Sequence, residues 1–597
     1  MKQSDRIYKI EKIVCMMLIS IFEWHQLDIS CNLEKEIHVI DIKCIILNIC
    51  IIMIINLIIY ILTNRLWLTM IMSETMWTII SIVNYYVIQY HGMPLTVTEM
   101  KNFKTAIAVL GSYDFCIDII LVKILSICVL VVLYSFFEKK HEKNTKRSIK
   151  TILLSSSVIL LCGTYLFWGL CGQNPIKPKK TIGWSWKEAY GKYGYLACVI
   201  EDFYFKNNIF NKPENYSLDE VEIVCNKYLS EKEINNENDR YPDIIFIVNE
   251  SFYDLKHLVD FETDVDYLKN IHDMDNLISG YAVSPTPYGG TNSSEYELLT
   301  SNSLYLMNSG VTPFNVIDLK GATSVVSHLK SLGYSTLGTH TESGINYNRV
   351  TGYNDLGFDT VKFEEEYENL EYYYGRWYET DSSVYKNIEK WYEEMGDEPR
   401  FLYLLTIQNH GNWDLNKPEY DKVHVVDSKF EITDVVNEYL TSISLSDEAF
   451  FEITEYFKNV DRPVIVCMVG DHCPSFAGEI VDKNLNEDEK ALKLRETPIY
   501  IWANFEIDKK EIGSVSMPFV MPLLLETADV PLSSYYEYIL DLNMNVPIIT
   551  AYGKYFDSNY NCFPINEGQY SGLVNEYFSI EYSSLGDKKQ KNEAFFE

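Results

Sequence analysis

The chain has 597 residues, of which 51 are Lys or Arg and 84 are Asp or Glu, so its formal net charge is −33. Its mean hydropathy is −0.09, and 47% of its residues are hydrophobic, which is enough for more than one domain core. The charge is divided unevenly, because residues 1–175 hold 16 basic and 13 acidic side chains whereas residues 176–597 hold 35 and 71. The acidic second part argues against nucleic acid as a partner, since phosphate backbones bind basic surfaces.

The first 175 residues predict a helical transmembrane domain. Residues 44–62 carry no charge, and together with residues 40–43 they would form a helix of about 35 Å, long enough to cross a bilayer. Other apolar segments of similar length precede and follow it, the weakest being the first, which Glu23 and His25 interrupt. We predict about five spans, at residues 13–27, 40–62, 66–90, 115–137 and 151–170.

The loops between these spans predict their orientation. Residues 138–150 contain six Lys or Arg side chains, which the positive-inside rule places in the cytoplasm. The last span then leads outward, so the residues after 175 are expected to be extracellular. The protein is therefore expected to be a multi-pass cell-membrane protein with its second part outside the cell.

Residues 176–240 predict a linker that is aromatic and partly helical. Its aromatic side chains leave two alternatives, a helical connector lying on the outer membrane surface or a segment packed against the following domain. We expect a second folded domain at residues 241–560. Residues 561–597 are expected to form a C-terminal extension, whose tail from Gly586 onward would fray.

Short apolar runs in this second domain alternate with amphipathic stretches of helical length. This alternation is typical of an α/β domain with a mostly parallel central sheet. Ligands of such domains bind beyond the carboxyl ends of the strands. The predicted strands lie at residues 243–248, 335–338, 401–407, 463–469 and 498–502.

Four of these runs end in side chains that can bind a metal ion or a phosphate. Glu250 follows the first run, His340 the second, His410 the third, and Asp471 with His472 the fourth. One His or Glu after a strand is usually a cap or a surface residue. Four strands that bring such groups to one edge favour a metal or phosphate site.

A fifth element adds a hydroxyl group to this edge. Gly289 and Gly290 precede Thr291, and a helix is expected at residues 296–307, which places Thr291 at or near its N-terminus. Free N–H groups and the helix dipole favour a bound anion there. Thr291 is then a candidate nucleophile on phosphorus, although Thr291 or Ser293 as a simple N-cap is the commoner arrangement.

These residues lie in motifs that resemble the lipoteichoic acid synthase-like phosphoglycerol transferases, sulfatase-type members of the alkaline phosphatase superfamily. The motifs run in order over roughly residues 240–505: DIIFIVNESFYDL at 243–255, GGTNSSEYELLT at 289–300, SGINYNRVTGYNDLGFD at 343–359, QNHGNWD at 408–414 and GDHCPSF at 470–476. The resemblance implies a membrane-anchored, extracellular domain of alkaline phosphatase/sulfatase type with a mostly parallel sheet.

The resemblance also implies roles for individual residues. One divalent ion, typically Mn²⁺, would be held by Glu250, Thr291, Asp471 and His472, with Thr291 also the nucleophile. This hard-ligand set suits Mn²⁺ or Mg²⁺ and tolerates Zn²⁺. Further residues match positions that contact the phosphoglycerol group: His340, Glu342, Tyr347, Arg349 and His410. Tyr347 and Glu342 stand where lipoteichoic acid synthases have tryptophan and aspartate, which leaves the headgroup and the acceptor open.

The reaction implied by this resemblance transfers glycerophosphate from phosphatidylglycerol through a phospho-threonine intermediate. The acceptor would be a glycerophosphate polymer, a glycolipid or a wall polysaccharide. Arg349 would bind the phosphoryl group, and His410 or His340 would move a proton. Three alternatives share the fold: a phosphoethanolamine transferase, a sulfatase-like phosphodiesterase and a catalytically inactive binding protein.

Overall fold

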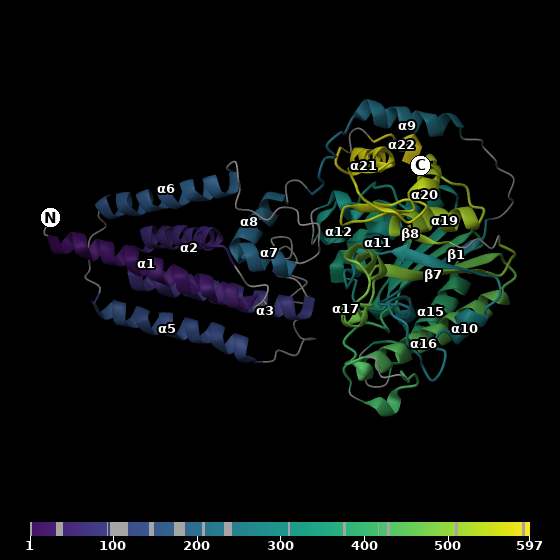
Figure 1. Ribbon diagram of the computed structural model, residues 1–597, viewed down its shortest axis with the longest axis horizontal. Coiled ribbons are helices and arrows are strands. Elements are labelled where there is room, and N and C mark those ends of the chain that lie inside the picture. The colour runs from purple at the N-terminus through teal and green to yellow at the C-terminus, as the bar shows by residue number, and fades with distance from the viewer. Residues whose placement is uncertain are drawn as a thin grey trace. The chain divides into compact units, whose positions relative to one another are not determined.

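The computed structural model divides into two compact units, residues 1–208 and residues 209–597, which Figure 1 draws with their helices and strands labelled. The residues that the structure describes are 3–31, 40–91, 94–95, 117–141, 149–171, 186–205, 209–231, 241–307, 311–344, 346–373, 376, 378–415, 417–426, 430–507, 512–587 and 591–596.

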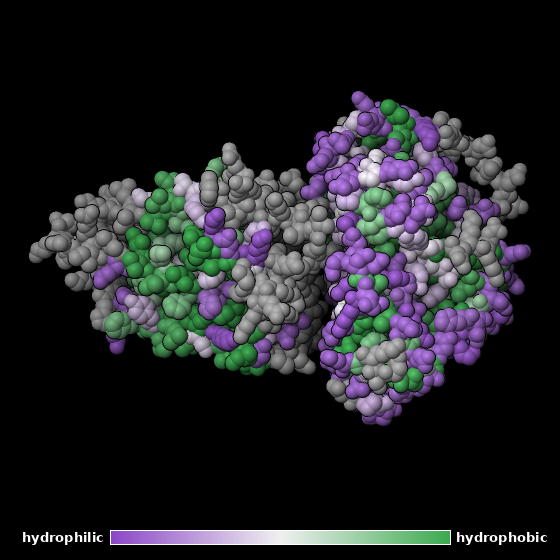
Figure 2. Space-filling model, in the orientation of Figure 1, coloured by the Kyte–Doolittle hydropathy of each residue, from purple (hydrophilic) through white to green (hydrophobic). Residues whose placement is uncertain are grey.

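The first unit is a bundle of long helices. They are α1 (Gln3–Ser30), α2 (Ile42–Thr63), α3 (Leu66–His91), α5 (Ile119–His141) and α6 (Ile149–Cys171). Within the described residues, four stretches are long and apolar enough to cross a membrane: Glu11–Ser30, Ile42–Thr63, Leu66–Gln89 and Ile119–Lys140. In α6 the described apolar stretch is shorter, at Ser155–Phe167. Many large apolar side chains of these helices face outward (Figure 2), as a lipid-facing surface requires. The count of five spans stays a prediction.

Polar side chains meet inside this bundle. The buried carboxylate of Glu23 accepts hydrogen bonds from Asn56 Nδ2 at 2.6 Å and from Ser73 Oγ at 2.5 Å. These bonds join α1, α2 and α3. Lipid offers no partner to a polar group, so such groups are placed in the interior of a bundle, where they hydrogen-bond to one another.

The segment expected as a linker belongs to both units. Its first helices, α7 (Trp186–Tyr193) and α8 (Tyr195–Phe205), pack in the first unit, where Asn48 Oδ1 of α2 accepts from the backbone N–H of Leu196 at 2.9 Å. Helix α9 (Leu218–Glu231) instead packs in the second unit. The described aromatic residues of α7 and α8 therefore pack with the apolar bundle, and their position at a membrane surface stays a prediction.

The second unit is built on an eight-stranded sheet of order β4-β3-β5-β1-β6-β7-β2-β8. All neighbours are parallel except at β7, which is antiparallel to β6 and β2. The mostly parallel sheet is therefore confirmed, with the predicted strand at 498–502 as the antiparallel one. The strands are β1 (Asp243–Asn249), β2 (Leu277–Val283), β3 (Ser335–His340), β4 (Thr360–Lys362), β5 (Arg400–Leu405), β6 (Val464–Gly470), β7 (Glu496–Ala503) and β8 (Ser514–Ser516).

Helices cover both faces of this sheet. Along β1, Ile244, Phe246 and Val248 point into one apolar core, and Ile245 and Ile247 point into the other, as the two-residue period of a strand requires. In Figure 1, α10 (Lys269–Asp273), α15 (Asp381–Glu394) and α16 (Thr433–Lys458) lie on one side of the sheet. The other side is covered by α9, α11 (Thr291–Thr300), α19 (Val520–Thr527), α20 (Ser534–Asn545) and α21 (Ser571–Leu585). The unit is thus a three-layer α/β/α sandwich.

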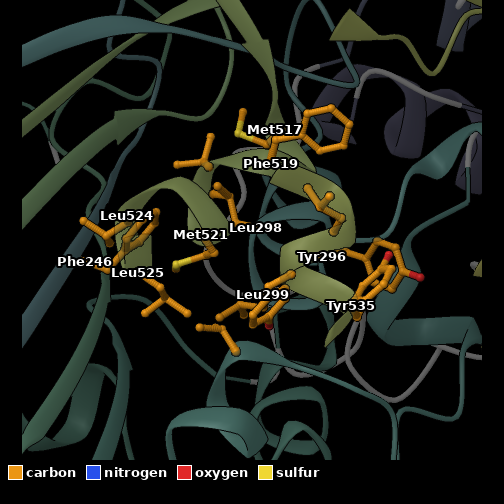
Figure 3. Close-up of a cluster of buried hydrophobic side chains, with 14 of the residues drawn as sticks. Phe246, Tyr296, Leu298, Leu299, Met517, Phe519, Met521, Leu524, Leu525 and Tyr535 are labelled. Atoms are coloured by element: carbon orange, nitrogen blue, oxygen red, sulfur yellow. The ribbon is translucent and has the colours of Figure 1, made fainter. Parts of the chain in front are cut away.

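Helix α11 is fixed by its apolar side. Tyr296, Leu298 and Leu299 lie in a buried cluster with Met517, Met521 and Leu525, as Figure 3 shows. The expected helix at residues 296–307 is therefore corrected, because α11 begins at Thr291 and ends at Thr300. Because Tyr296, Leu298 and Leu299 are buried in this cluster, the N-terminus of α11 is held in position.

The C-terminal residues are part of this unit. Val574, Tyr577 and Phe578 of α21 are buried in the same core as α11, and so are Phe595 and Phe596 of α22 (Glu593–Phe596). A small second sheet of order β11-β10-β9 precedes them, formed by β9 (Ile548–Ile549), β10 (Lys554–Phe556) and β11 (Cys562–Pro564). The described residues of the range 561–597 therefore help complete the core, and Phe595 and Phe596 are packed rather than frayed.

The remaining described helices are short connections in the second unit: η3 (Leu255–His257), η4 (Leu304–Leu306), α12 (Pro313–Val316), α13 (Val325–Ser331), η5 (Asn346–Asn348), α14 (Arg349–Leu356), η6 (Glu364–Glu366), η7 (Pro418–Tyr420), α17 (Ala477–Ile480), α18 (Glu487–Lys493) and η8 (Met517–Phe519).

Candidate active site

The carboxyl ends of four neighbouring parallel strands meet at one edge of the sheet. His340 is the last residue of β3, Glu250 directly follows β1, and Asp471 with His472 directly follows β6. His410 lies in the loop after β5. The edge expected from the sequence is therefore formed, and loops at such an edge commonly bind ligands.

Three buried side chains converge at this edge. His472 Nε2 lies 3.4 Å from Glu250 Oε1 and 3.1 Å from Asp471 Oδ2. Potential ligand atoms of Glu250, Asp471 and His472 all lie within 4.8 Å of one another. This group is a possible metal site whose two carboxylates and one imidazole match the ligand preferences of a divalent cation.

Thr291 approaches Glu250 and His472 from helix α11. It is the first residue of α11, and its Oγ1 donates to Glu250 Oε2 at 3.0 Å and lies 3.4 Å from His472 Nε2. The preceding Gly290 has a φ of 81°, a left-handed conformation that favours glycine. A nucleophile at this helix N-terminus would have an anionic group beside free N–H donors.

Backbone contacts orient the possible metal ligands. Asp471 Oδ1 accepts from the N–H groups of Ser251 and His472 at 2.7 and 2.8 Å. His472 Nδ1 donates to the carbonyl of Cys473 at 3.0 Å, which leaves Nε2 directed at the carboxylates. Gly470, which precedes Asp471, lets the backbone of Phe252 lie close to the end of β6. A Cβ at position 470 would lie 2.1 Å from the backbone oxygen of Phe252.

The charges of the cluster fit a bound cation. Burial and the neighbouring Glu250 carboxylate raise the pKa of Asp471 to about 7. Asp471 Oδ2 is also buried without a hydrogen-bond donor, although His472 Nε2 is 3.1 Å away. One divalent cation would offset the repulsion between the Glu250 and Asp471 carboxylates. The same cation would give Asp471 Oδ2 a positively charged partner.

Arg349 is held by Glu295 of α11, the helix that begins at Thr291. Arg349 Nε and Nη2 donate to Glu295 Oε1 at 2.9 and 2.6 Å, and both side chains are buried. Tyr353 donates its hydroxyl to Glu295 Oε2 at 2.8 Å. Sequence reasoning gave Glu295 no role, although its position four residues after Thr291 places both on the same face of a helix.

The two histidines of the expected pocket differ in environment. His340 is buried, and its Nδ1 donates to the carbonyl of Leu405 at 3.1 Å. Burial, and then the positive charge of Arg349, lower the pKa of His340 well below its ordinary value, so the ring is neutral near pH 7. His410 is exposed, and its Nδ1 lies 2.8 Å from the Gly411 carbonyl and 2.9 Å from the Tyr378 hydroxyl.

The remaining two predicted residues lie on the loop between β3 and α14. Tyr347 is 38% exposed, and its ring centre lies 5.0 Å from Arg349 Cζ. Glu342 is half-buried, and its pKa is raised by burial and then by Glu364, while the charges of His410 and Arg349 lower it. The predicted site residues therefore lie on this edge of the sheet and the loops beside it, with Tyr347 and His410 exposed.

A buried polar network under this edge was missed by sequence reasoning. Asp381 Oδ2 accepts from Asn249 Nδ2 at 2.8 Å and from Ser446 Oγ at 2.6 Å, while Asn409 Nδ2 donates to Asn249 Oδ1 at 2.8 Å. Asn249 precedes Glu250, and Asn409 precedes His410. The network therefore fixes the positions from which both side chains project, and only the adjacency of these polar residues to the motifs could have indicated it.

Comparison with known proteins supports the same fold. Residues 242–530 match the family model described as Sulfatase. A protein of Rhizobium meliloti (strain 1021) named as a putative cyclic beta-1,2-glucan modification protein is 26% identical over 358 residues, or 58% of this chain and 54% of the relative. The chain spans about half the length of the curated relatives it matches.

Solved structures are similar to it as well. The Streptococcus pyogenes phosphoglycerol transferase GacH, in complex with sn-glycerol-1-phosphate, has 22% identity and a TM-score of 0.53, covering 65% of this chain and 99% of that one. The integral membrane phosphoethanolamine transferase EptA of Neisseria meningitidis has 11% identity and a TM-score of 0.45, covering 85% and 95%. Residues 242–530 therefore form a Sulfatase-type domain, and at these identities the likeness to GacH shows the fold alone.

Proposed function

We propose that this chain, which carries a Sulfatase-family domain at residues 242–530, is a membrane-anchored phosphoglycerol transferase. It would move glycerophosphate from phosphatidylglycerol to a cell-envelope glycopolymer or glycolipid outside the cell. The observation that carries the proposal is the position of Thr291 Oγ1, 3.0 Å from Glu250 Oε2 and 3.4 Å from His472 Nε2 at the N-terminus of α11. Phosphoglycerol as the transferred group is supported by the motifs at residues 243–476 and by the activity named for GacH.

In this proposal Glu250, Thr291, Asp471 and His472 hold one divalent ion, with Mn²⁺ the best match. The ion would lower the pKa of a ligand hydroxyl and neutralise charge on the phosphoryl oxygens. The Thr291 hydroxyl donates a hydrogen bond to Glu250 Oε2, so the lone pairs of Thr291 Oγ1 point away from the Glu250 carboxylate. The N–H groups at the start of α11 face the phosphate that Thr291 attacks.

The reaction has two displacement steps at phosphorus. Thr291 Oγ1 gives up its proton and forms a bond to phosphorus as the bond to the diacylglycerol oxygen breaks, and the diacylglycerol oxygen takes a proton. An acceptor hydroxyl then gives up its proton and forms a bond to phosphorus as the bond to Thr291 breaks, and Thr291 Oγ1 takes a proton. The product is a glycerophosphoryl ester on the acceptor, and Thr291 returns to its starting state.

We assign the proton transfers to His410 rather than to His340. The depressed pKa of His340 makes it a poor proton carrier near pH 7, and its Nδ1 is committed to Leu405. Its remaining nitrogen accepts hydrogen bonds and suits a glycerol hydroxyl. His410 is exposed, and the contacts at its Nδ1 leave Nε2 for an alcohol or alkoxide.

A phosphoethanolamine transferase is the second candidate. Burial raises the pKa of Glu379 to about 7 near the expected headgroup pocket, and the charge of Glu342 raises it as well. Glu364 adds a third carboxylate that acts on both. An ammonium headgroup would be attracted by these carboxylates, whereas glycerol would use them only as hydrogen-bond acceptors.

One experiment separates these candidates. The full chain in lipid nanodiscs is given Mn²⁺ and either fluorescent phosphatidylglycerol or fluorescent phosphatidylethanolamine, and released diacylglycerol is measured. We expect release from phosphatidylglycerol by the wild type and none by Thr291→Ala. Release from phosphatidylethanolamine alone would refute phosphoglycerol transfer and favour the second candidate.

A further inference from the structure

A cavity in the second unit is lined by none of the residues assigned to the candidate active site. Its volume is about 670 Å³, within the roughly 300–1,000 Å³ that small-molecule sites occupy. Its described lining comes mainly from η3, α10, β2, α18, β7, β8 and the segment before β8, together with Tyr560. The cavity is therefore built by elements that the proposed reaction leaves unused.

The floor of this cavity is one face of the β2–β7 pair. Tyr281 lies opposite Pro498, and Ser279 lies opposite Tyr500. Residues two apart on a strand point to the same side, so these four side chains share a face. The floor therefore contains two tyrosine rings, of which Tyr281 is half-buried.

A charged group forms one wall of the cavity. Glu496 accepts from His257 Nε2 at 2.6 Å and from Ser514 Oγ at 2.5 Å, and its side chain is 4% exposed. His257 stacks on the Tyr281 ring with centres 4.0 Å apart and planes at 21°. Lys493 Nζ lies 2.9 Å from His257 Nε2 and 3.5 Å from Glu496 Oε2. The carboxylate has both oxygens occupied, so its effect is to hold the imidazole and the ammonium in place.

The groups left to face a ligand are both donors and acceptors. The Lys493 side chain is 33% exposed and has three N–H donors, of which the Glu496 carboxylate, 3.5 Å away, can take one. Glu489 of α18 lines the same cavity and is exposed. The lining carries Asp254, Glu489 and Glu496 against a single Lys, so an anionic ligand would be repelled.

We propose that this cavity binds a neutral glycan, the sugar portion of the acceptor. This inference rests on the proposed function, which requires an acceptor. Sugar hydroxyls donate to carboxylates and accept from ammonium groups, and sugar ring faces pack on exposed aromatic rings such as Tyr560 of the lining. An anionic glycerophosphate polymer fits the lining poorly because of its excess of carboxylates.

The cavity is connected to the reacting centre through one short loop. Glu250 contacts Thr291, and Asp254, four residues later, lines the cavity. Within that loop Tyr253 donates its hydroxyl to the backbone oxygen of Lys493 at 2.6 Å. A glycan in the cavity therefore contacts a segment that also carries a group of the active site.

The test is binding of an uncharged probe to the full chain in nanodiscs. The probe is a short β-1,2-linked gluco-oligosaccharide, titrated by isothermal calorimetry, with sn-glycerol-1-phosphate as the charged comparison. The cavity variants are Lys493→Gln and Glu489→Gln, and their matched controls on the same helix are Lys490→Gln and Glu487→Gln, which do not line the cavity. Glu489→Gln keeps a side chain that can complete the capping box with Asn486.

We expect each cavity variant to bind the glucan at least about tenfold more weakly, because each loses a charge-assisted hydrogen bond, while both controls bind like the wild type. Diacylglycerol release from phosphatidylglycerol without acceptor should be unchanged in all four variants. Absence of glucan binding to the wild type, or binding unaffected by both cavity variants, would overturn the inference. Glucan binding that needs Lys493, in a protein that does not cleave phosphatidylglycerol, would uphold the cavity and refute only the proposed function.

Discussion

Arg349 and Glu295 form a forked ion pair in the interior of the catalytic unit, with Nε and Nη2 both donating to Oε1 at 2.9 and 2.6 Å. The Arg349 side chain is 3% exposed and that of Glu295 is 0% exposed. Glu295 stands on α11 four residues after Thr291. The candidate nucleophile and the candidate phosphate-binding guanidinium are therefore positioned by the same helix.

Glu295→Gln should leave Arg349 buried without a countercharge. We expect a loss of about 1–3 kcal/mol in the free energy of unfolding, because the hydrogen bonds can persist but the charge is no longer balanced. The kcat should fall by about tenfold or more, since a displaced guanidinium orients the phosphoryl group poorly. Thermal unfolding and diacylglycerol release measure the two effects.

Tyr353→Phe is the matched control for this change. It removes one hydroxyl that donates to Glu295 Oε2 but leaves the ion pair intact, so its effect should be about 1 kcal/mol and its kcat near that of the wild type. Equal kcat values for Glu295→Gln and the wild type would contradict a positioning role for Glu295.

Thr291→Ala should abolish transfer, whereas Thr291→Ser should retain part of it, because serine supplies the same hydroxyl. We expect a loss of at least about a thousandfold for alanine, in the range found when a nucleophile is removed. Intact-mass spectrometry of the wild type trapped without acceptor should show a glycerophosphoryl adduct that maps to Thr291. An adduct on the alanine variant would identify another nucleophile.

Removal of divalent ions should stop the reaction and lower the thermal stability of the catalytic unit. A cation at 100 times its Kd would add about 2.7 kcal/mol to the free energy of unfolding. Chelation followed by Mn²⁺ should restore both activity and melting temperature in the wild type, and Asp471→Asn should lose the metal-dependent shift. Full recovery with Zn²⁺ but none with Mn²⁺ would contradict the assignment of manganese.

The pH dependence of stability should report Glu297, one of the buried residues of α11. Burial raises the pKa of Glu297 from 4.5 to about 8. The folded state then holds this proton more tightly than the unfolded state, so the stability it contributes is present below pH 4.5 and is lost as the pH rises toward 8. Glu297→Gln should therefore raise the melting temperature at pH 8.5 and leave it unchanged at pH 4.5.

The control for Glu297 is Glu526→Gln, an exposed side chain on α19. Its melting temperature should follow that of the wild type at both pH values. A Glu297→Gln variant that is no more stable than the wild type at pH 8.5 would show that the carboxylate is satisfied in its charged form.

The sequence predicted those parts of the fold that carry long apolar signals. The runs ending before Glu250, His410 and Asp471 became β1, β5 and β6, because strands buried on both faces read as continuous hydrophobic segments. Strands of two or three residues, such as β8 and β9, carry too few side chains for such a pattern. They are formed by packing with neighbours that are distant in sequence.

The start of α11 shows why part of the site could not be predicted. All ten of its residues are buried, including the polar side chains of Asn292, Ser293, Ser294 and Glu295. A helix buried all round has no amphipathic period, so the apolar pattern began only at Tyr296. The partnership of Glu295 with Arg349 joins residues 54 positions apart, and no local pattern in one sequence encodes such a contact.

The topology predicted for the membrane unit can be tested with an epitope tag placed at residue 3. The basic loop at 138–150 and the basic residues Lys2, Arg6, Lys9 and Lys12 favour a cytoplasmic N-terminus, which requires an odd number of spans before the extracellular unit. The tag should bind antibody only after the cells are permeabilised, while a tag after Asp587 should bind in intact cells. Labelling of the residue 3 tag in intact cells would show that Glu11–Ser30 does not cross the membrane in the proposed direction, and the five-span arrangement would then be wrong.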